Sequence, residues 1–388
     1  MNDFPSNVKQ KLNSIIQDMS NHHWLFTNNP GRDFSRQHLG KLSFYDTMRM
    51  IIGMGKGSTS DEIMDYFELD PARIPSQSAF NQRRSQISLS AFEYLFSEFA
   101  SAFPATTNSF KDHCILAFDG CHVVYTTNAE ILEDYNKPHL IDYKGYNHMH
   151  LNGFVDVISK AFIDVVLQPG QHPDERGAMR AMLDHFHPDT PEKYIITADR
   201  GYESYDLLFQ CELKKLHYVF RVKAPSSSRS ILKIKTAEDT YEYIITNLPF
   251  SFDKNDIKDI YHWRWGIEVS FRYLKHANGL LHFHCKKPEF LKQEIYANLV
   301  LYNFGIFLAN EAAEENKRRK RKSTNKYAYE VDISTALKLA RKYFIRNGTG
   351  KDIDIIKLMM KYVHAVKTEF RQFARPLRGI GAIHFGYR

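Results

Sequence analysis

Two aspartates each follow a short apolar run that predicts a strand buried on both faces. Asp119 comes after Cys114–Phe118, and Asp199 comes after Tyr194–Ala198. A carboxylate at the C-terminal end of such a strand lies at the edge of the sheet where ligands bind. Two carboxylates that meet there repel each other unless a cation lies between them, and oxygen ligands favour Mg²⁺ or Mn²⁺. The alternative is a pair of ordinary surface acids at strand ends.

A third acid lies in a helix that the apolar spacing predicts over residues 253–276. Positions that advance by three or four share one narrow stripe of this helix: Tyr261, Arg264, Glu268, Phe271 and Lys275. An apolar stripe lies beside it, so the helix can pack on that side and present Glu268 between two cations. An amphipathic helix with an ordinary ion pair between Arg264 and Glu268 explains the same pattern.

The elements around these acids indicate an α/β fold. Strands are predicted over residues 148–157, 160–167 and 218–222, and helices over 174–186, 203–213 and 289–314. Alternating β-branched residues within 224–250 predict a small β insertion ahead of the third acid. His172 and Glu175 are candidates for the outer shell of a metal site, although acids also favour a helix N-terminus.

Three motifs in this order resemble a known family. The spacing Tyr-x2-Arg-x3-Glu-x6-Lys over residues 261–275 is similar to the Y-R-E-K signature of bacterial insertion-sequence transposases. It resembles specifically the insertion-sequence-four family of DDE enzymes, in the retroviral-integrase-like superfamily. Phe118-Asp119-Gly120 and Asp199-Arg200-Gly201-Tyr202 are similar to the first and second acidic motifs of that family. The resemblance covers roughly residues 110–310.

The resemblance implies an RNase H-like core, with a mixed five-stranded sheet flanked by helices. In such a core Asp119, Asp199 and Glu268 would be the catalytic residues and would bind two Mg²⁺, with Mn²⁺ as a substitute. One ion would activate water and later a 3′-hydroxyl, and the other would stabilise the leaving oxygen. The residues expected to grip DNA phosphates are Tyr261, Arg264, Lys275 and Arg200.

Near the N-terminus, two predicted helices have the spacing of a helix–turn–helix unit. They cover residues 60–69 and 76–84, and the second carries Gln77, Asn81, Arg83 and Arg84. Because Arg and Asn or Gln pair bidentately with guanine and adenine, this helix is a candidate for reading DNA ends. A plain helical pair with a solvated polar face is the alternative.

Composition supports a polyanionic partner. The 388 residues carry a formal net charge of +7, which divides into −1 for residues 1–118, −5 for 119–252 and +13 for 253–388. Four cysteines without a C-x-x-C motif favour a reducing compartment. The longest apolar stretch, residues 295–309, contains two asparagines and is shorter than the ~20 residues of a membrane span. We therefore expect no membrane association and a cytoplasmic protein; the resemblance to the transposase family implies a bacterial source and association with the nucleoid.

These observations predict three parts: an N-terminal helical DNA-binding region (1–108), an RNase H-like DDE core (109–310) and a basic C-terminal helical region (311–388). The expected function is cut-and-paste transposition, in which the chain binds terminal inverted repeats and catalyses strand cleavage and transfer. Its partners would be double-stranded DNA, as transposon ends and target, and a second copy of the chain. The helices after residue 328 are candidates for pairing the protomers, or for packing on the core. The alternatives are a nuclease or resolvase without strand transfer, and a non-catalytic DNA-binding protein derived from a transposase.

Overall fold

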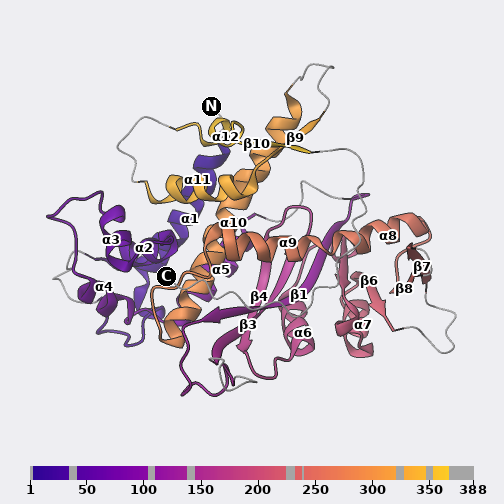
Figure 1. The fold of residues 1–388 in the computed structure, drawn as a ribbon, viewed down its shortest axis with the longest axis horizontal. Coiled ribbons are helices and arrows are strands. Elements are labelled where there is room, and N and C mark those ends of the chain that lie inside the picture. Colours follow the sequence, from indigo (N-terminus) through magenta and orange to yellow (C-terminus); the bar gives the residue numbers. More distant parts are fainter. Residues whose placement is uncertain are drawn as a thin grey trace.

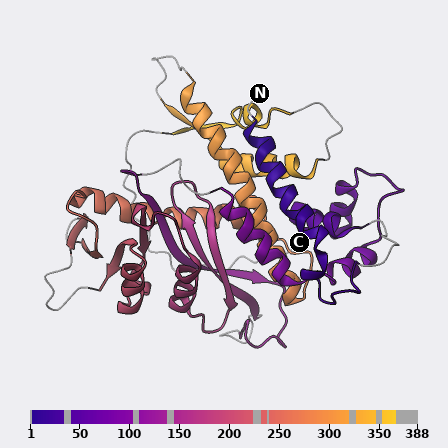
Figure 2. The same ribbon diagram turned by 180° about the vertical axis from the view of Figure 1, so that it is seen from behind.

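The computed structural model describes residues 3–34, 42–103, 110–137, 145–223, 232–237, 240–319, 327–346 and 353–366. A large mixed sheet occupies the middle of the molecule, with helices on both faces (Figure 1). A second group of helices, from both ends of the chain, gathers beside it (Figure 2). Within the described residues, no helix is long and apolar enough to cross a membrane.

The sheet has eight strands. Their bounds are β1 Cys114–Tyr125, β2 Tyr135–Asn136, β3 Tyr146–Asp156, β4 Phe162–Pro169, β5 Tyr194–Ala198, β6 His217–Val222, β7 Leu232–Ala237 and β8 Thr240–Thr246. The order is β2-β3-β1-β5-β6-β8-β7, with β4 paired to β3. Strands β1, β5 and β6 run parallel, whereas β3 and β4 are antiparallel on one side and β7 and β8 on the other. The predicted hairpin exists, and it extends the edge of the central sheet.

Two sets of helices cover the sheet because β1 and β5 are apolar on both faces. Helices α6 (Glu175–His185) and α7 (Tyr205–Leu213) share an apolar cluster with Phe118 and Phe154, whose rings stack 4.1 Å apart. The opposite face carries α8 (Lys254–Trp263), α9 (Gly266–Arg272), a π-helical segment (Tyr273–Asn278) and α10 (Pro288–Arg318). Asp119 therefore lies within, and Asp199 at the end of a strand of, a sheet that is packed from both sides.

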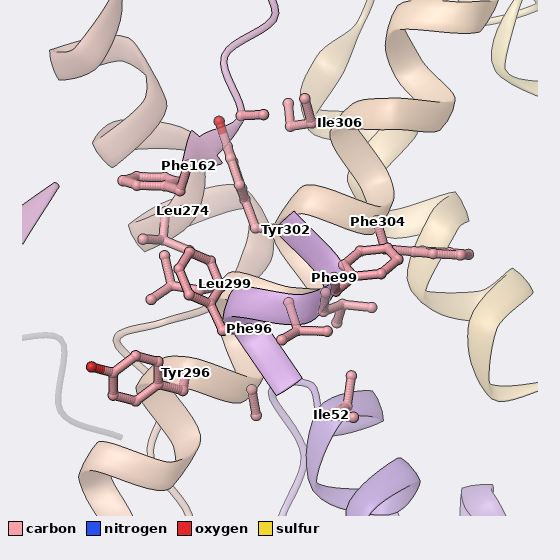
Figure 3. Packing of buried hydrophobic residues seen from close by; sticks show 14 of the residues in the cluster. Ile52, Phe96, Phe99, Phe162, Leu274, Tyr296, Leu299, Tyr302, Phe304 and Ile306 are labelled. Carbon is pink, nitrogen blue, oxygen red and sulfur yellow. The ribbon is translucent and has the colours of Figure 1, made fainter. Parts of the chain in front are cut away.

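Helix α10 is the centre of the second group. Helices α1 (Phe4–Asn21), α2 (Phe44–Gly53) and α5 (Leu89–Ser101) pack on it, as do α11 (Ile333–Ile345) and α12 (Ile355–Met359). Figure 3 shows Phe96 and Phe99 of α5 against Tyr302 and Phe304 of α10, with Ile52 of α2 close by. One apolar cluster thus includes residues of all three predicted parts of the chain.

A buried polar side chain joins α10 to the sheet. Asn303 is fully buried; its side-chain amide donates to the Phe162 carbonyl at 2.7 Å, and its Oδ1 accepts from the Phe162 amide at 3.0 Å. These two bonds satisfy backbone groups of β4 that face α10. The asparagine that interrupts the apolar stretch in the sequence therefore has a structural explanation.

The first and last helical segments also bond directly. Lys9 of α1 donates to the carbonyls of Tyr343 and Arg346 at 2.7 and 2.8 Å, and Arg49 of α2 donates to the Phe344 carbonyl at 2.8 Å. Arg341 of α11 donates to the Gly53 carbonyl at 2.7 Å. These hydrogen bonds thus join segments that are about 300 residues apart in sequence.

The C-terminal segment differs from the prediction that residues 328–345 and 352–366 are both helical. Residues 328–366 form β9 (Ala328–Val331), α11, α12 and β10 (Val363–Val366), and β9 pairs antiparallel with β10. The apolar face proposed to pair protomers or to pack on the core comprises Ile353, Ile356, Met360 and Val363. Ile356 and Met360 are 1% and 3% exposed within the core, whereas Ile353 is 37% exposed and Val363 is half-buried. Part of that face therefore packs inside the chain. Two short helices complete the N-terminal group, α3 (Thr59–Tyr66) and α4 (Gln77–Arg84).

Candidate active site

Asp119 lies inside a strand and not at its end. Strand β1 continues to Tyr125 because its pairing with β3 continues, and Asp119 is opposite Gly153. The amide of Gly120 donates to Asp119 Oδ1 at 2.9 Å. Burial raises the pKa of the Asp119 carboxyl to about 6; the Gly120 hydrogen bond and the Arg264 guanidinium act against this shift, whereas the Glu268 and Glu175 carboxylates add to it. Asp119 is thus a half-buried acid with two other acids near it.

Asp199 follows β5, as predicted. The parallel register pairs Ala117 with Thr197, and continuing this offset by two residues brings Asp119 level with Asp199. Neighbouring strands are about 4.8 Å apart, and residues two apart project from the same face. The register therefore directs both carboxylates to the face that carries α9.

The loop after β5 holds Asp199 in place. Asp199 Oδ1 accepts from the Arg200 amide at 2.5 Å and caps the short helix Arg200–Tyr202. Arg221 of β6 lies with Nη1 3.9 Å from Asp199 Oδ1 and 3.6 Å from Glu242 Oε1 of β8. Sequence reasoning missed Arg221, although a lone cation within the apolar run Tyr218–Val222 was a signal for it.

Glu268 lies on a helix that is broken where a continuous one was predicted. Helix α8 ends at Trp263 and α9 begins at Gly266, where an added Cβ would lie 3.1 Å from the Val157 carbonyl oxygen. Helix α9 packs on β1 and β3, and Phe271 contacts Gly153, the partner of Asp119. Glu268 is exposed, one turn before Phe271, in a shallow depression beside Trp265. This position lets its charge act on Asp119.

The break changes the orientation of the predicted stripe. Arg264 is 2% exposed, with its guanidinium 4.8 Å from the Trp265 ring and 5.4 Å from the Tyr261 ring. Tyr261 is also buried. Both side chains are therefore buried beside the break between α8 and α9, and do not form the solvent-facing stripe that the spacing predicted. From there, the Arg264 charge lowers the pKa of Asp119.

The other two phosphate-binding candidates remain accessible. Lys275 is half-buried in the π-helical segment, near Cys121 of β1, where its charge opposes the effect of burial on the pKa of the Cys121 thiol. Arg200 is exposed directly after Asp199. Both flank the acids, one on each side.

The helix predicted to read DNA is present, but its two arginines differ in how far they are exposed. Ser76 caps α4, and Gln77 and Asn81 are exposed. Arg83 is half-buried, with its guanidinium 5.0 Å from the Phe34 ring. Arg84 is 1% exposed, and its Nη1 lies 2.7 Å from Glu294 Oε1 of α10. Arg84 therefore does not reach the surface, because its charge forms a buried ion pair.

A further acid, Glu175, lies beside the strands β1 and β3. Glu175, the first residue of α6, has Oε1 3.0 Å from His150 Nε2 of β3. The hydrogen bond to His150 lowers the pKa of Glu175, burial opposes this, and Asp199 is among the charges that act on it. An alanine at position 120 would place its Cβ 2.2 Å from His150 Nε2, so glycine is required beside Asp119.

The chemistry of these residues fits a hard divalent cation. All donors are carboxylate oxygens. Burial is the main cause that raises the pKa of Asp119, and the charges of Glu268 and Glu175 add to it; a bound cation relieves repulsion of this kind. Across the residues that the structure describes, no three acid, histidine or cysteine side chains already converge on one metal position.

Comparison with known proteins adds the family. A family model described as a transposase DDE domain matches residues 110–304, while no curated protein matches the chain. Among solved structures, the chain is similar to a cryo-EM structure of a piggyBac transposase synaptic complex with hairpin DNA, with 12% identity and a TM-score of 0.46 over 92% of this chain and 84% of that chain. A likeness of this degree carries no conclusion about function. Because the family model spans half of the chain and includes Asp119, Asp199 and Glu268, this protein belongs to the transposase DDE domain family.

Proposed function

We propose that this transposase is the enzyme of a bacterial insertion sequence, of the insertion-sequence-four type, and that its core is RNase H-like. The order β4-β3-β1-β5-β6, antiparallel and then parallel, supports the core assignment, together with helices on both faces. The observation that carries the function is that Asp119 of β1 lies level with Asp199 after β5, with α9, which carries Glu268, packed on β1. The reaction is cleavage at the transposon ends followed by strand transfer into target DNA.

Asp119, Asp199 and Glu268 are the proposed catalytic residues and would hold two Mg²⁺ or Mn²⁺. Bound metal supplies activation of the nucleophile and stabilisation of the leaving oxygen in the in-line displacement at phosphorus. The Arg200 amide fixes Asp199 for this task. The buried Arg264 keeps Asp119 more acidic than burial alone would allow. Arg264 thus acts through a catalytic acid, which differs from the phosphate grip expected from the sequence.

DNA contacts are proposed for the accessible cations. Arg200 and Lys275 flank the acids, and the C-terminal third carries the net charge of +13. Helix α4 is proposed to read the terminal repeats through Gln77, Asn81 and Arg83. Both DNA ends must be cut to release an element, so we propose that a homodimer assembles on DNA. The expected location is the bacterial cytoplasm, on the nucleoid.

The test uses duplex DNA that carries the terminal repeats read from the sequence flanking the coding region, with Mg²⁺ or Mn²⁺. Asp119→Asn, Asp199→Asn and Glu268→Gln are expected to lose end cleavage while still binding the duplex. Asp189→Asn and Glu192→Gln are matched controls, because both acids are exposed ahead of β5, away from Asp199. Full cleavage by any of the three active-site variants would overturn the proposal.

The products of this reaction distinguish transposition from two other candidate functions. A supercoiled target plasmid added to the reaction records strand transfer as joined DNA. Cleavage without joining would favour a nuclease or resolvase on the same core. End binding without cleavage by the unsubstituted protein would favour a non-catalytic DNA-binding protein.

A further inference from the structure

Helix α7 carries an exposed apolar stripe. Tyr205, Phe209 and Leu213 follow one another at intervals of four residues, so they lie along one side of the helix. They are 92%, 61% and 68% exposed. The other side of α7 packs on β6 and α6, within the apolar cluster of that face of the sheet. We call the three exposed side chains the α7 stripe.

A surface helix of this composition is unusual. Six of the nine residues of α7 are apolar, and a helix that is apolar on all sides is ordinarily covered on all sides. Single exposed apolar residues are common on proteins, whereas a contiguous patch marks an interaction site. The exposed fractions give the α7 stripe roughly 400 Å² of accessible surface, since a large side chain buries about 150–250 Å² when it is fully covered. We therefore expect a partner to cover it.

The polar side chains of α7 already have partners within the chain. Asp206 forms an ion pair with Arg180 of α6, and Gln210 donates to a carboxylate of α6 at 2.6 Å. On the other flank, Glu212 Oε1 accepts from Asn247 Nδ2 at 3.2 Å. The flanks of the α7 stripe thus carry charges of both signs, whereas a surface that binds DNA is predominantly basic. This face therefore suits a protein partner.

The α7 stripe is symmetric about its central residue. Tyr205 lies four residues before Phe209, and Leu213 lies four residues after it. In a two-fold contact, each group of one copy meets the group at the equivalent distance on the other copy. Two antiparallel copies of α7 would therefore pack Phe209 on Phe209, and Tyr205 of each copy on Leu213 of the other.

The charges on the flanks follow the same symmetry. Asp206 and Glu212 lie three residues before and after the centre of the stripe, and ~100° per residue places them on opposite flanks of it. The two-fold contact therefore brings Glu212 of each copy to the Asp206–Arg180 pair of the other. Arg180 is 52% exposed, so its guanidinium is accessible to this second carboxylate. An identical copy is thus complementary to this face in charge as well as in shape.

Covering the α7 stripe leaves the candidate active site open. Helices α6 and α7 pack together on one face of the sheet, and α9 packs on the other (Figure 1). The register of β1 and β5 directs Asp119 and Asp199 to the face that carries α9. A partner on α7 therefore does not cover these acids.

We propose that two copies of this chain associate through their α7 stripes, antiparallel about a two-fold axis at Phe209. A stable interface buries about 800 Å² on each partner, with an apolar centre and a polar rim. The α7 stripe supplies roughly half of that area as the centre, and the flanks supply the rim. This contact needs neither DNA nor metal, so it goes beyond the proposed function.

The experiment measures the mass of the full-length protein in EDTA, without DNA, by sedimentation equilibrium. We expect twice the 45.4 kDa of one chain for the parent. Phe209→Glu places two like charges at the axis and should weaken the dimer about a hundredfold or more. Leu132→Glu is the matched control, because Leu132 is 74% exposed between β1 and β2 and should leave the mass unchanged. Circular dichroism confirms that each variant is folded.

A pair of variants tests the antiparallel arrangement. Tyr205→Lys and Leu213→Glu each place a charge against an apolar side chain, so each alone should weaken the dimer about tenfold. In an equimolar mixture, the ammonium introduced at 205 meets the carboxylate introduced at 213 of the other chain. The mixture should therefore dimerise more tightly than either variant alone. A mixture no tighter than the separate variants would refute the antiparallel contact.

Two results would overturn the inference and leave the proposed function standing. A parent that is monomeric at about 100 μM would mean that another segment of the chain or a different protein covers the α7 stripe. A parent and a Phe209→Glu variant that are equally dimeric would place the contact on another surface. Neither result bears on end cleavage, which is tested separately by the variants of Asp119, Asp199 and Glu268.

Discussion

Replacing Arg84 by methionine tests whether this residue holds the molecule together or reads DNA. Arg84 Nη1 is 2.7 Å from Glu294 Oε1, Nε is 3.1 Å from Gln293 Oε1, and Nη2 donates to the Phe290 carbonyl at 2.6 Å. Both charged side chains are at most 2% exposed. Removing one partner of such a buried pair costs about 3–5 kcal/mol, because the other charge remains in a dry environment.

The matched control is its neighbour. Arg83 is half-buried, and its charge rests on the Phe34 ring, so Arg83→Met is expected to cost about 1 kcal/mol or less. The double variant Arg84→Met/Glu294→Gln removes the orphaned charge while keeping an acceptor for the His284 amide. We expect it to recover about 1–3 kcal/mol relative to Arg84→Met alone.

The assay is urea unfolding followed by circular dichroism, at pH 7 and at lower pH. Burial by itself raises the pKa of Glu294, but hydrogen bonding from His284 and the charge of Arg84 bring it down to about 2. A depressed pKa gives stability that is present above the ordinary value near 4.5 and is lost as the pH falls through about 2. The parent should therefore lose this stability over that window, and the double variant should not.

Comparing the urea midpoints of Arg84→Met and Arg83→Met decides whether the buried ion pair stabilises the fold. If Arg84→Met unfolds at the same urea concentration as Arg83→Met, the buried pair does not stabilise the fold. If the folded Arg84→Met protein has in addition lost its preference for terminal repeats over random duplex, the original assignment of Arg84 to DNA reading is correct.

Three further substitutions follow from the structure. In EDTA, Asp119→Asn should raise the urea midpoint at pH 7.5 and change it far less at pH 4, because a carboxyl with a raised pKa destabilises the fold progressively as the pH rises from its ordinary value of 3.8 to about 6. Gly120→Ala should cost about 1–3 kcal/mol in urea unfolding, since its Cβ would lie 2.2 Å from His150 Nε2, whereas Gly201→Ala, with open space around it, should stay within about 0.5 kcal/mol. Asn303→Leu should cost about 2–4 kcal/mol and speed amide hydrogen exchange in β4, because two buried backbone groups lose their partners.

Local patterns were sufficient to predict β5 and the position of Asp199. The run Tyr194–Ala198 is apolar on both faces, and an acid next to it has to lie at the strand end. The same logic placed Asp119 at a strand end and was wrong there. Strand β1 continues through polar positions such as His122 because β3 pairs with it, and a partner strand cannot be read from the local sequence.

The helix break at residues 264–265 also lay beyond the sequence pattern. The three-and-four spacing of residues 261–275 continues across the break, so periodicity alone predicts one helix. The break depends on the close packing of Gly266 against Val157, a tertiary contact. Its result is that Arg264 turns inward while Glu268 stays outside. The acid could be predicted from its motif, but the orientation of its neighbours could not.

Arg84 also shows that the sequence does not reveal whether a charged side chain is exposed or buried in an ion pair. On a short polar helix, two adjacent arginines look equally available for DNA. Only the position of Glu294 on α10, 210 residues later, distinguishes them. Long-range pairs of this kind leave no spacing signal in the sequence.

The bonds between α1, α2 and α11 have a consequence for synthesis of the chain. Arg49 must wait for the carbonyl of Phe344, 295 residues later, which takes roughly 15–60 s at typical rates of translation. During that time the apolar faces of the N-terminal helices lack their final cover. A chain that stops before α11 therefore exposes these faces to chaperones and proteases. Prematurely terminated copies of this chain should therefore accumulate little in cells, so they would be poor inhibitors of the full-length protein.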